Sequence, residues 1–298
     1  MVTRSAWVLN FDAEDELAQP GRVTSGRALE SRRSALEGLV RDLIALDDVI
    51  VRRETRLEPG AFVGRAWCPT PQAVRLLGAA GARALASPSF EILRRVNHRA
   101  FAAELGQTLP GARFVRSRAE LEAALAREKT WWLLKRPFGF AGRGRMRVLP
   151  ERILANEERW IEASLRTGEG LQVEPFVERT VDFALHGFVR RAGTVILGAP
   201  TRQECDPTGA WRSSVRLGER ELSSAESIAL VDAAREAGLA LAKAGYFGPF
   251  GIDGFRWTIA GGEPSFNPRC EINARYSMGW ATGMGTLRPD LDGETEEG

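Results

Sequence analysis

The sequence is poor in the residues that support thiol or imidazole chemistry. Its 298 residues include two histidines and three cysteines, and Cys68, Cys205 and Cys270 lie far apart with no CxxC pair. A disulfide framework, a zinc site and a histidine-rich metal centre are therefore not expected. No run of about 18 apolar residues occurs, so no membrane span is expected. The first residues also lack the apolar segment of a signal peptide, and we expect a cytoplasmic protein.

Two common phosphate-binding signatures are also missing. No GxGxxG follows the first predicted strand, and the glycine-rich segment near residue 140 does not match GxxxxGK[ST]. The net charge of +2 is small for a general nucleic-acid binder. An apolar content of 44% and a charged content of 27% are typical of a soluble globular protein, and the length allows two or three subdomains.

The first 95 residues alternate predicted strands with predicted helices, which favours an open, largely parallel α/β sheet. The elements are a strand over Trp7–Phe11, an acidic loop over 12–16, a helix over 29–46, a short strand over Val49–Val51 and a helix that begins after Pro71 and ends at Gly78 or Gly81. Residues 91–109 then predict one further helix. Its His98 is interpreted as a packed or solvated residue rather than a site residue.

A basic, glycine-rich segment follows in WWLLKRPFGFAGRGRMRVL, residues 131–149. It predicts two strands joined by a loop, with five basic residues and no acid between Lys135 and Arg147. Glycine-rich backbone can approach an anion closely, and arginine can bind it through two hydrogen bonds. The segment therefore predicts a phosphate-binding loop. The alternatives are a tight basic hairpin on the surface or a nucleic-acid patch.

A bend between two strands comes next, after a helix predicted over 151–166. The chain reads as a strand that breaks at Pro175 and a longer strand that runs through Phe188. Backbone groups exposed at such a bend can pair with the edge of an adenine, and the nearby acids Glu174 and Asp182 suit ribose hydroxyls. The alternative is that both acids cap ordinary turns.

The stretch Tyr246–Gly279 holds the strongest candidate for a metal site. Asp253 and Glu271 lie on two predicted strands joined by a turn at 260–264. The two-residue period of a strand puts Glu271, Asn273 and Arg275 on one face, so that Asp253 can stand opposite them. Carboxylate and amide oxygens suit Mg²⁺. The alternative is an edge hairpin with ordinary polar residues on its wet face.

The order of these motifs resembles the ATP-grasp superfamily of carboxylate–amine or carboxylate–thiol ligases. The resemblance rests on KRPFGFAGRGRMRV, VEPFVERTVDF, GPFGIDGFRW and EINAR, and it covers about residues 95–285. It implies an N-terminal open α/β domain followed by a two-lobed α+β unit with antiparallel sheets. The expected domains are 1–95, a central lobe over 96–176 with the lid, and a C-terminal lobe over 177–298 with the magnesium site.

The resemblance also implies roles for individual residues. Lys135 and Arg275 would act on the transferring phosphate. Where the first domain faces the strands of the magnesium site, Arg202 and Arg212 are candidates to clamp a substrate carboxylate, and the alternative is that they belong to a structural loop. Three residues would hold Mg²⁺, usually as two ions and with Mn²⁺ as an alternative: Asp253, Glu271 and Asn273. The nucleotide would be bound by the lid, the hinge and an arginine in place of the family's upstream lysine, which are Arg99, Lys135, Gly139, Gly142, Gly144, Arg145, Glu174, Phe176, Val177 and Asp182.

Members of the superfamily mostly use ATP to convert a carboxylate into an acyl-phosphate, which an amine or another nucleophile then attacks. The expected partners are thus ATP, a small-molecule or peptide carboxylate and a nucleophile, with no nucleic acid or membrane, and an oligomer is allowed. Further candidates for the acceptor site are Trp211, Arg212, Tyr276 and Ser277. One alternative is a non-catalytic or regulatory nucleotide-binding protein on the same fold, and another is nucleic-acid binding through 135–147.

Overall fold

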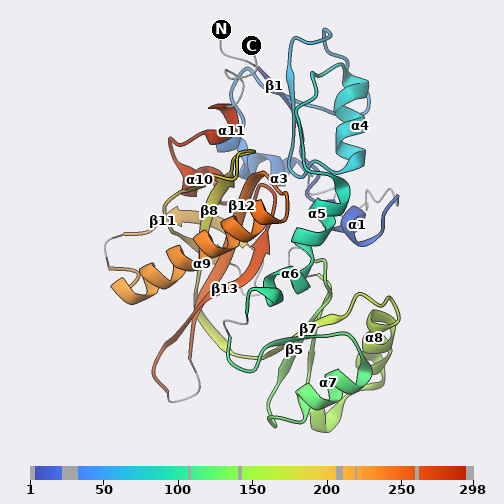
Figure 1. Ribbon diagram of the computed structural model, residues 1–298, viewed down its shortest axis with the longest axis vertical. Helices are drawn as coiled ribbons and strands as arrows, with labels where there is room; N and C mark the ends of the chain where they lie inside the picture. The colour runs from blue at the N-terminus through green and yellow to red at the C-terminus, as the bar shows by residue number, and fades with distance from the viewer. Residues whose placement is uncertain are drawn as a thin grey trace.

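The computed structural model describes residues 4–21, 33–106, 109–139, 143–205, 211–218, 220–258 and 262–292. Three β-sheets follow one another along the chain, and each has helices of its own (Figure 1). Within these ranges, no helix combines the length and the apolar character that crossing a membrane requires.

The first sheet is parallel and has the order β2-β1-β3. Its strands are β1 (Ser5–Val8), β2 (Val49–Ile50) and β3 (Val63–Ala66), of which β3 was not predicted. Helix α4 (Pro71–Ala80) packs on it and ends at Gly81, whose φ of 93° is a left-handed conformation that suits glycine. The predicted parallel α/β sheet and the predicted helix after Pro71 are confirmed.

The acidic stretch after β1 was expected to be a loop, and this prediction is wrong. It forms helix α1 (Ala13–Ala18), and both Glu14 and Glu16 are buried. Each acid has a partner elsewhere in the chain: Glu14 contacts Arg275, and Glu16 accepts a hydrogen bond from the backbone N–H of Gln72. The predicted helix over 29–46 is also interrupted in its described part, as α3 (Arg33–Leu39) and the short 3-10 helix η1 (Arg41–Leu43).

The single helix predicted over 91–109 is in fact two helices, α5 (Phe90–Asn97) and α6 (Arg99–Glu104). His98 lies between them in an extended conformation with a ψ of 131°. Its ring accepts a hydrogen bond from the backbone N–H of Ala100 and so caps α6. The other ring nitrogen lies 3.2 Å from Glu169. This structural role explains the break, which helical periodicity alone does not reveal.

The second sheet is antiparallel, with the order β4-β7-β5-β6. Its strands are β4 (Arg113–Val115), β5 (Trp132–Lys135), β6 (Arg145–Val148) and β7 (Leu171–Pro175). Helices α7 (Arg118–Leu125) and α8 (Ala155–Leu165) contribute to one apolar core with Trp132 and Leu134. The helix predicted over 151–166 is thus shorter, since 3-10 helix η2 (Pro150–Arg152) precedes it.

The third sheet is also antiparallel, with the order β11-β10-β8-β12-β13 and with β9 paired to β8. Its strands are β8 (Glu178–Val189), β9 (Val195–Leu197), β10 (Thr201–Cys205), β11 (Trp211–Arg216), β12 (Gly248–Thr258) and β13 (Ser265–Asn273). Helix α9 (Ser224–Lys243) packs on one face, where Phe183, Leu185 and Ile252 join the main core. The predicted mixed fold with antiparallel sheets is confirmed.

The end of the described chain returns to the first sheet through α10 (Trp280–Met284) and α11 (Pro289–Asp292). Arg65 of β3 donates a hydrogen bond of 2.8 Å to the carbonyl of Asp290. The Asp290 carboxylate accepts one of 3.0 Å from the Tyr276 hydroxyl. Domain boundaries at residues 95 and 176 remain a proposal, although each expected segment holds one of the three sheets.

Candidate nucleotide and metal site

The hairpin of β12 and β13 brings the two candidate metal carboxylates together. Asp253 pairs directly with Glu271, and Gly251 pairs with Asn273, so these side chains share one face of the sheet. The predicted hairpin and its register are therefore confirmed. The metal-binding role of the three residues stays a prediction.

Two amides hold Asp253 in place. Gln203 of β10 donates a hydrogen bond of 2.6 Å to Oδ1, and Asn273 donates one of 3.0 Å to Oδ2. Burial, followed by the negative charge of Glu271, raises the pKa of Asp253 to about 6. Gln203 was not predicted as a site residue. Neighbouring residues of a strand point to opposite faces, so Gln203 lies on the face of Asp253 and Arg202 lies on the other face.

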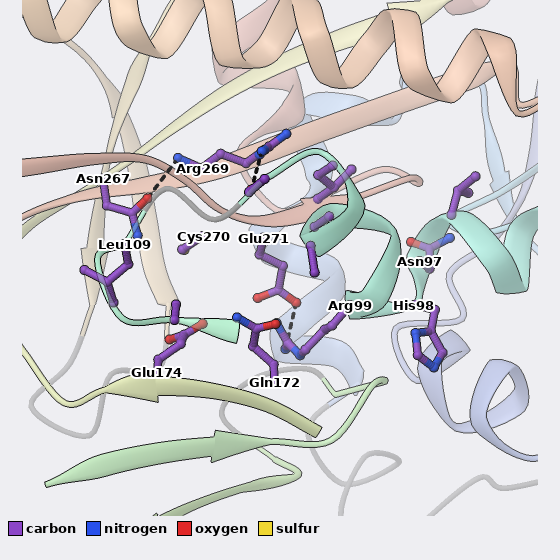
Figure 2. A pocket seen from close by; sticks show the side chains of 16 residues that line it. Asn97, His98, Arg99, Leu109, Gln172, Glu174, Asn267, Arg269, Cys270 and Glu271 are labelled. Carbon is purple, nitrogen blue, oxygen red and sulfur yellow. Dashed lines mark hydrogen bonds and ion pairs between the residues drawn. The ribbon is translucent and has the colours of Figure 1, made fainter. Parts of the chain in front are cut away.

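Glu271 is paired with a cation from another element. Its Oε1 lies 2.9 Å from Nη2 of Arg99, at the start of α6 (Figure 2). Burial raises the pKa of Glu271, but the positive charges of Arg99 and Lys135 outweigh it and hold that pKa below its ordinary value. Arg99 also donates a hydrogen bond of 3.0 Å to the carbonyl of Arg136. It therefore joins the acidic hairpin to the basic loop.

The donor set fits a hard divalent cation through its two carboxylates. The two carboxylates are direct register partners, so their negative charges repel each other. A divalent cation between them would reduce that repulsion. Asn273 turns its amide nitrogen to Asp253 and its oxygen to Arg275, at 3.2 Å, so its amide must turn over to act as a ligand. The described residues contain no cluster of three or more His, Cys, Asp or Glu side chains suited to a metal.

A buried ion pair stands opposite the hairpin, on the second sheet. Lys135 at the end of β5 lies 2.6 Å from Oε2 of Glu174 on β7, and both side chains are less than one tenth exposed. Glu174, Arg99 and Glu271 line one cavity between β7, α6 and β13, as Figure 2 shows. The structure thus brings together residues that the sequence separates by up to 172 positions, from Arg99 to Glu271.

The predicted hinge lies at the edge of this cavity. The backbone N–H of Phe176 donates a hydrogen bond of 2.7 Å to the carbonyl of Trp131, which ties the hinge to the start of β5, and its role toward adenine stays a prediction. Val177 packs with Cys270 and Phe255, which gives the site an apolar wall. Asp182, the predicted ribose ligand, lies 3.2 Å from Arg179, whose guanidinium stacks 3.9 Å from the centre of the Phe255 ring.

The predicted lid joins β5 to β6. The N–H of Arg136 donates a hydrogen bond of 2.7 Å to the carbonyl of Gly144, and Gly144 has a φ of 70°. A Cβ on Gly139 would lie 2.6 Å from the Arg143 carbonyl, so a larger residue would force the loop to move. Arg145 begins β6 and is exposed. Gly142 lies outside the described residues.

The expectation that Arg202 serves the active site is wrong. Arg202 pairs with Phe183, on the face covered by α9, whereas Gln203 pairs with Asp182 on the metal face. Arg202 is bound instead by Glu221, at 3.1 Å, and by Glu204. The period of β10 explains the error, because a shift of one residue reverses the face.

The other acceptor candidates lie on β11, at one edge of the third sheet, and just after β13, at the other edge. Ser214 accepts a hydrogen bond of 3.0 Å from the Trp211 indole, while Arg212 is exposed. Tyr276 is buried in the main core, and Ser277 has a buried hydroxyl without a partner among the described residues. Arg275, two residues after the end of β13, contacts Glu14 of α1. This contact joins the first part of the chain to the strand that carries Glu271 and Asn273. Sequence periodicity offers no signal for that contact, because it spans 261 positions.

No protein-family model and no curated protein sequence matches this chain. Solved structures do. D-alanyl-alanine synthetase A from Vibrio cholerae superposes with a TM-score of 0.57 at 12% identity, over 99% of this chain and 97% of that one. Carboxyaminoimidazole ribonucleotide synthase from Aspergillus clavatus, solved with ATP, gives 0.50 at 15% identity, over 93% of this chain and 72% of that one.

A third match is partial. The biotin carboxylase domain of the Hydrogenobacter thermophilus 2-oxoglutarate carboxylase, solved with MgADP and bicarbonate, gives a TM-score of 0.50 at 16% identity. It covers 69% of this chain, which spans 45% of that domain's length. Together with the order of the sheets and of the motifs upon them, these matches show that the chain has the fold of the ATP-grasp superfamily.

Proposed function

We propose that this protein is an ATP- and Mg²⁺-dependent ligase that activates a carboxylate as an acyl-phosphate for attack by an amine or another nucleophile. The observation that supports it most directly is a cavity lined by a cation, Arg99, and by two acids, Glu174 and Glu271. Each acid leads to a further charged residue, since Lys135 is paired with Glu174 and Asp253 is the register partner of Glu271. The similar synthetase and synthase structures support ATP as the ligand, since one of them was solved with ATP.

The residues of the chain would position and neutralise rather than form covalent bonds. Asp253 and Glu271, with Asn273 after its amide turns, would hold Mg²⁺, which supplies neutralisation of phosphoryl charge when bound. Lys135 would contact the phosphates, and the Phe176 carbonyl and the backbone of Val177 would contact the adenine. Asp182 would bind the ribose. Such in-line phosphoryl transfer requires charge stabilisation and orientation, with no side-chain nucleophile.

Phosphate release in the presence of ATP and Mg²⁺ tests this proposal. Purified protein is screened against pooled carboxylates crossed with pooled amines and thiols, and active pools are divided until one pair remains. We expect release of phosphate and ADP that depends on both an acid and a nucleophile. The matched control is the Glu271→Gln protein, which keeps the shape of the side chain and removes its charge.

The same screen separates the alternatives. Saturable ATP binding without release of phosphate in any pool would favour a regulatory nucleotide-binding protein. Affinity for single-stranded DNA or RNA that ATP does not abolish would favour nucleic-acid binding through 135–147. A protein that does not bind ATP at all would overturn the proposal.

A further inference from the structure

The sequence resemblance gives Arg275 a role at the transferring phosphate, but it gives none to the acid that holds Arg275. Glu14 lies on α1, 261 positions earlier in the chain, and its Oε1 accepts a hydrogen bond of 2.6 Å from Nε of Arg275. Nη2 of Arg275 contacts the same oxygen. The Glu14 side chain is 8% exposed and that of Arg275 is 11% exposed. This is therefore a buried ion pair between the first domain and the end of the metal strand.

The contacts of Arg275 continue into the metal site. Nη2 also donates a hydrogen bond of 3.2 Å to Oδ1 of Asn273, whose amide nitrogen donates to Asp253. Nη1 donates one of 2.9 Å to the carbonyl of Tyr276. Glu14, Arg275, Asn273 and Asp253 thus form one chain of hydrogen bonds from α1 to the metal carboxylates.

Stabilisation of the fold is a weak explanation for the buried Glu14–Arg275 ion pair. Taking two charges out of water costs several kcal/mol for each ion, and their attraction often does no more than offset that cost. Oε2 of Glu14 is buried and has no partner among the described residues, which adds to the cost. The side-chain hydrogen bond and the ion pair of Glu14 both go to Arg275.

The pair also fixes the orientation of Arg275, which is a cation in a buried place. Its position is set by three different contacts at once, with Glu14, Asn273 and the Tyr276 carbonyl. Such a guanidinium is oriented before an anion arrives, so little ordering is needed on binding.

We infer that Glu14 is a positioning residue, which aims Arg275 at the terminal phosphate and so makes the first domain part of the active site. This inference rests on the proposed function, since it requires a phosphoryl group beside Asp253. Glu14 acts through Arg275 and is not itself placed on substrate.

The matched control lies on the same helix. Glu16 is also a buried acid of α1, but it accepts a hydrogen bond of 3.0 Å from the Gln72 backbone at the start of α4 and does not contact the metal strand. Glu14→Gln and Glu16→Gln therefore remove the same charge from the same helix. Glu14→Asp keeps the charge on a side chain that is shorter by one methylene, and it serves if Glu14→Gln does not fold.

The experiment compares affinity for a non-hydrolysable ATP analogue with affinity for ADP, by calorimetry in Mg²⁺, and measures kcat and KM on the identified substrates. In Glu14→Gln we expect the preference for the triphosphate to fall about tenfold, the size of one lost charge-assisted contact. We expect KM for ATP to rise by a similar factor, because the lost contact is already made in the bound triphosphate, and kcat to fall as well if the contact strengthens during transfer. Glu16→Gln keeps the wild-type preference and kcat.

Each failure has a different signature. A Glu14→Gln protein that melts earlier but keeps the wild-type preference and kcat would show that the pair only ties two domains together, and it would overturn the inference. Equal losses in Glu14→Gln and Glu16→Gln would show a general effect of α1 and would also overturn it. Failure of the proposed function looks different, because the wild-type protein itself then binds no ATP.

Discussion

The polar faces of the two antiparallel sheets carry opposite charge. On the second sheet, Lys135, Arg145 and Arg147 alternate with the apolar residues that pack under α7 and α8. On the third sheet, Asp182, Asp253 and Glu271 alternate with those that pack under α9. Both sheets use the same two-residue period to separate a core from a site.

This difference shows how one site can take a ligand of mixed charge. A nucleotide triphosphate with its metal presents anionic oxygens and a cation together, and under the proposed function the two sheets would match them from two sides. The basic face also holds one acid, Glu174, which is paired with Lys135, and on the acidic face Glu271 is paired with Arg99 of α6. Four substitution experiments can test this difference between the two faces, from the largest expected effect to the smallest.

The carboxylate pair should give the largest effect. Replacing Glu271 or Asp253 with alanine should lower Mg²⁺-dependent turnover about a thousandfold or more, because several kcal/mol of charge stabilisation are lost. Phosphate release measures this, with Asp232→Ala on α9 as a control for removing an exposed acid. Turnover of Glu271→Ala at the wild-type rate would show that the acidic face does not bind the metal.

On the basic face, Lys135→Ala should raise the Kd for ATP about tenfold or more, while that for adenosine changes little. A charge-assisted contact with phosphate is worth about 1.5–3 kcal/mol. Titrations of ATP, ADP and adenosine measure the difference. Lys129→Ala is the control, since the Lys129 side chain is 87% exposed. Equal weakening of all three ligands would indicate a damaged fold instead of a lost phosphate contact.

Neighbouring residues of β10 test whether the two faces of the third sheet are separate. Gln203→Leu should raise the Mg²⁺ concentration for half-maximal turnover about tenfold, because Asp253 loses a hydrogen bond of 2.6 Å. Arg202→Leu should leave it unchanged, since Arg202 lies on the α9 face. An effect of Arg202→Leu as large as that of Gln203→Leu would contradict this division.

The smallest effect is expected on the α9 face, in stability alone. The hydrogen bond from Arg256 lowers the pKa of Glu226 to about 2, so the ionised form is favoured by folding. This contribution, about 1 kcal/mol for a partly exposed pair, is present above pH 4.5 and disappears as pH falls toward 2. Glu226→Gln should therefore lower Tm at pH 7 but not at pH 2. A Tm difference that stays constant with pH would refute the assignment.

Period and turn signals were sufficient for the parts of the site that lie within one hairpin. Asp253, Glu271 and Asn273 share a face because strand geometry requires it, and the sequence shows that period directly. The alternating elements of the first 95 residues likewise predicted the parallel sheet. Such features depend on neighbours in the sequence, which is why no structure was needed to find them.

The errors fall where a distant partner decides. The acids of α1 look like loop residues until Arg275 and the start of α4 provide their partners. His98 is a local exception, because the backbone N–H that its ring accepts belongs to Ala100, only two positions later. Arg202 was predicted for its charge, whereas register with β8 puts its neighbour Gln203 on the face of the site. None of these contacts leaves a periodic trace in the sequence.

The contact of Arg65 with Asp290 bears on the order in which the chain can fold during synthesis. Arg65 is buried, and one partner of its guanidinium lies 225 positions later. On the same side, Trp7 of β1 packs against Tyr276. The second sheet instead closes its core from residues between Val115 and Val173. On the ribosome, the central lobe can therefore complete its core early, while one face of the first sheet stays uncovered until residues 276–290 have been made. A nascent chain stalled near residue 250 should resist protease in its middle before its beginning.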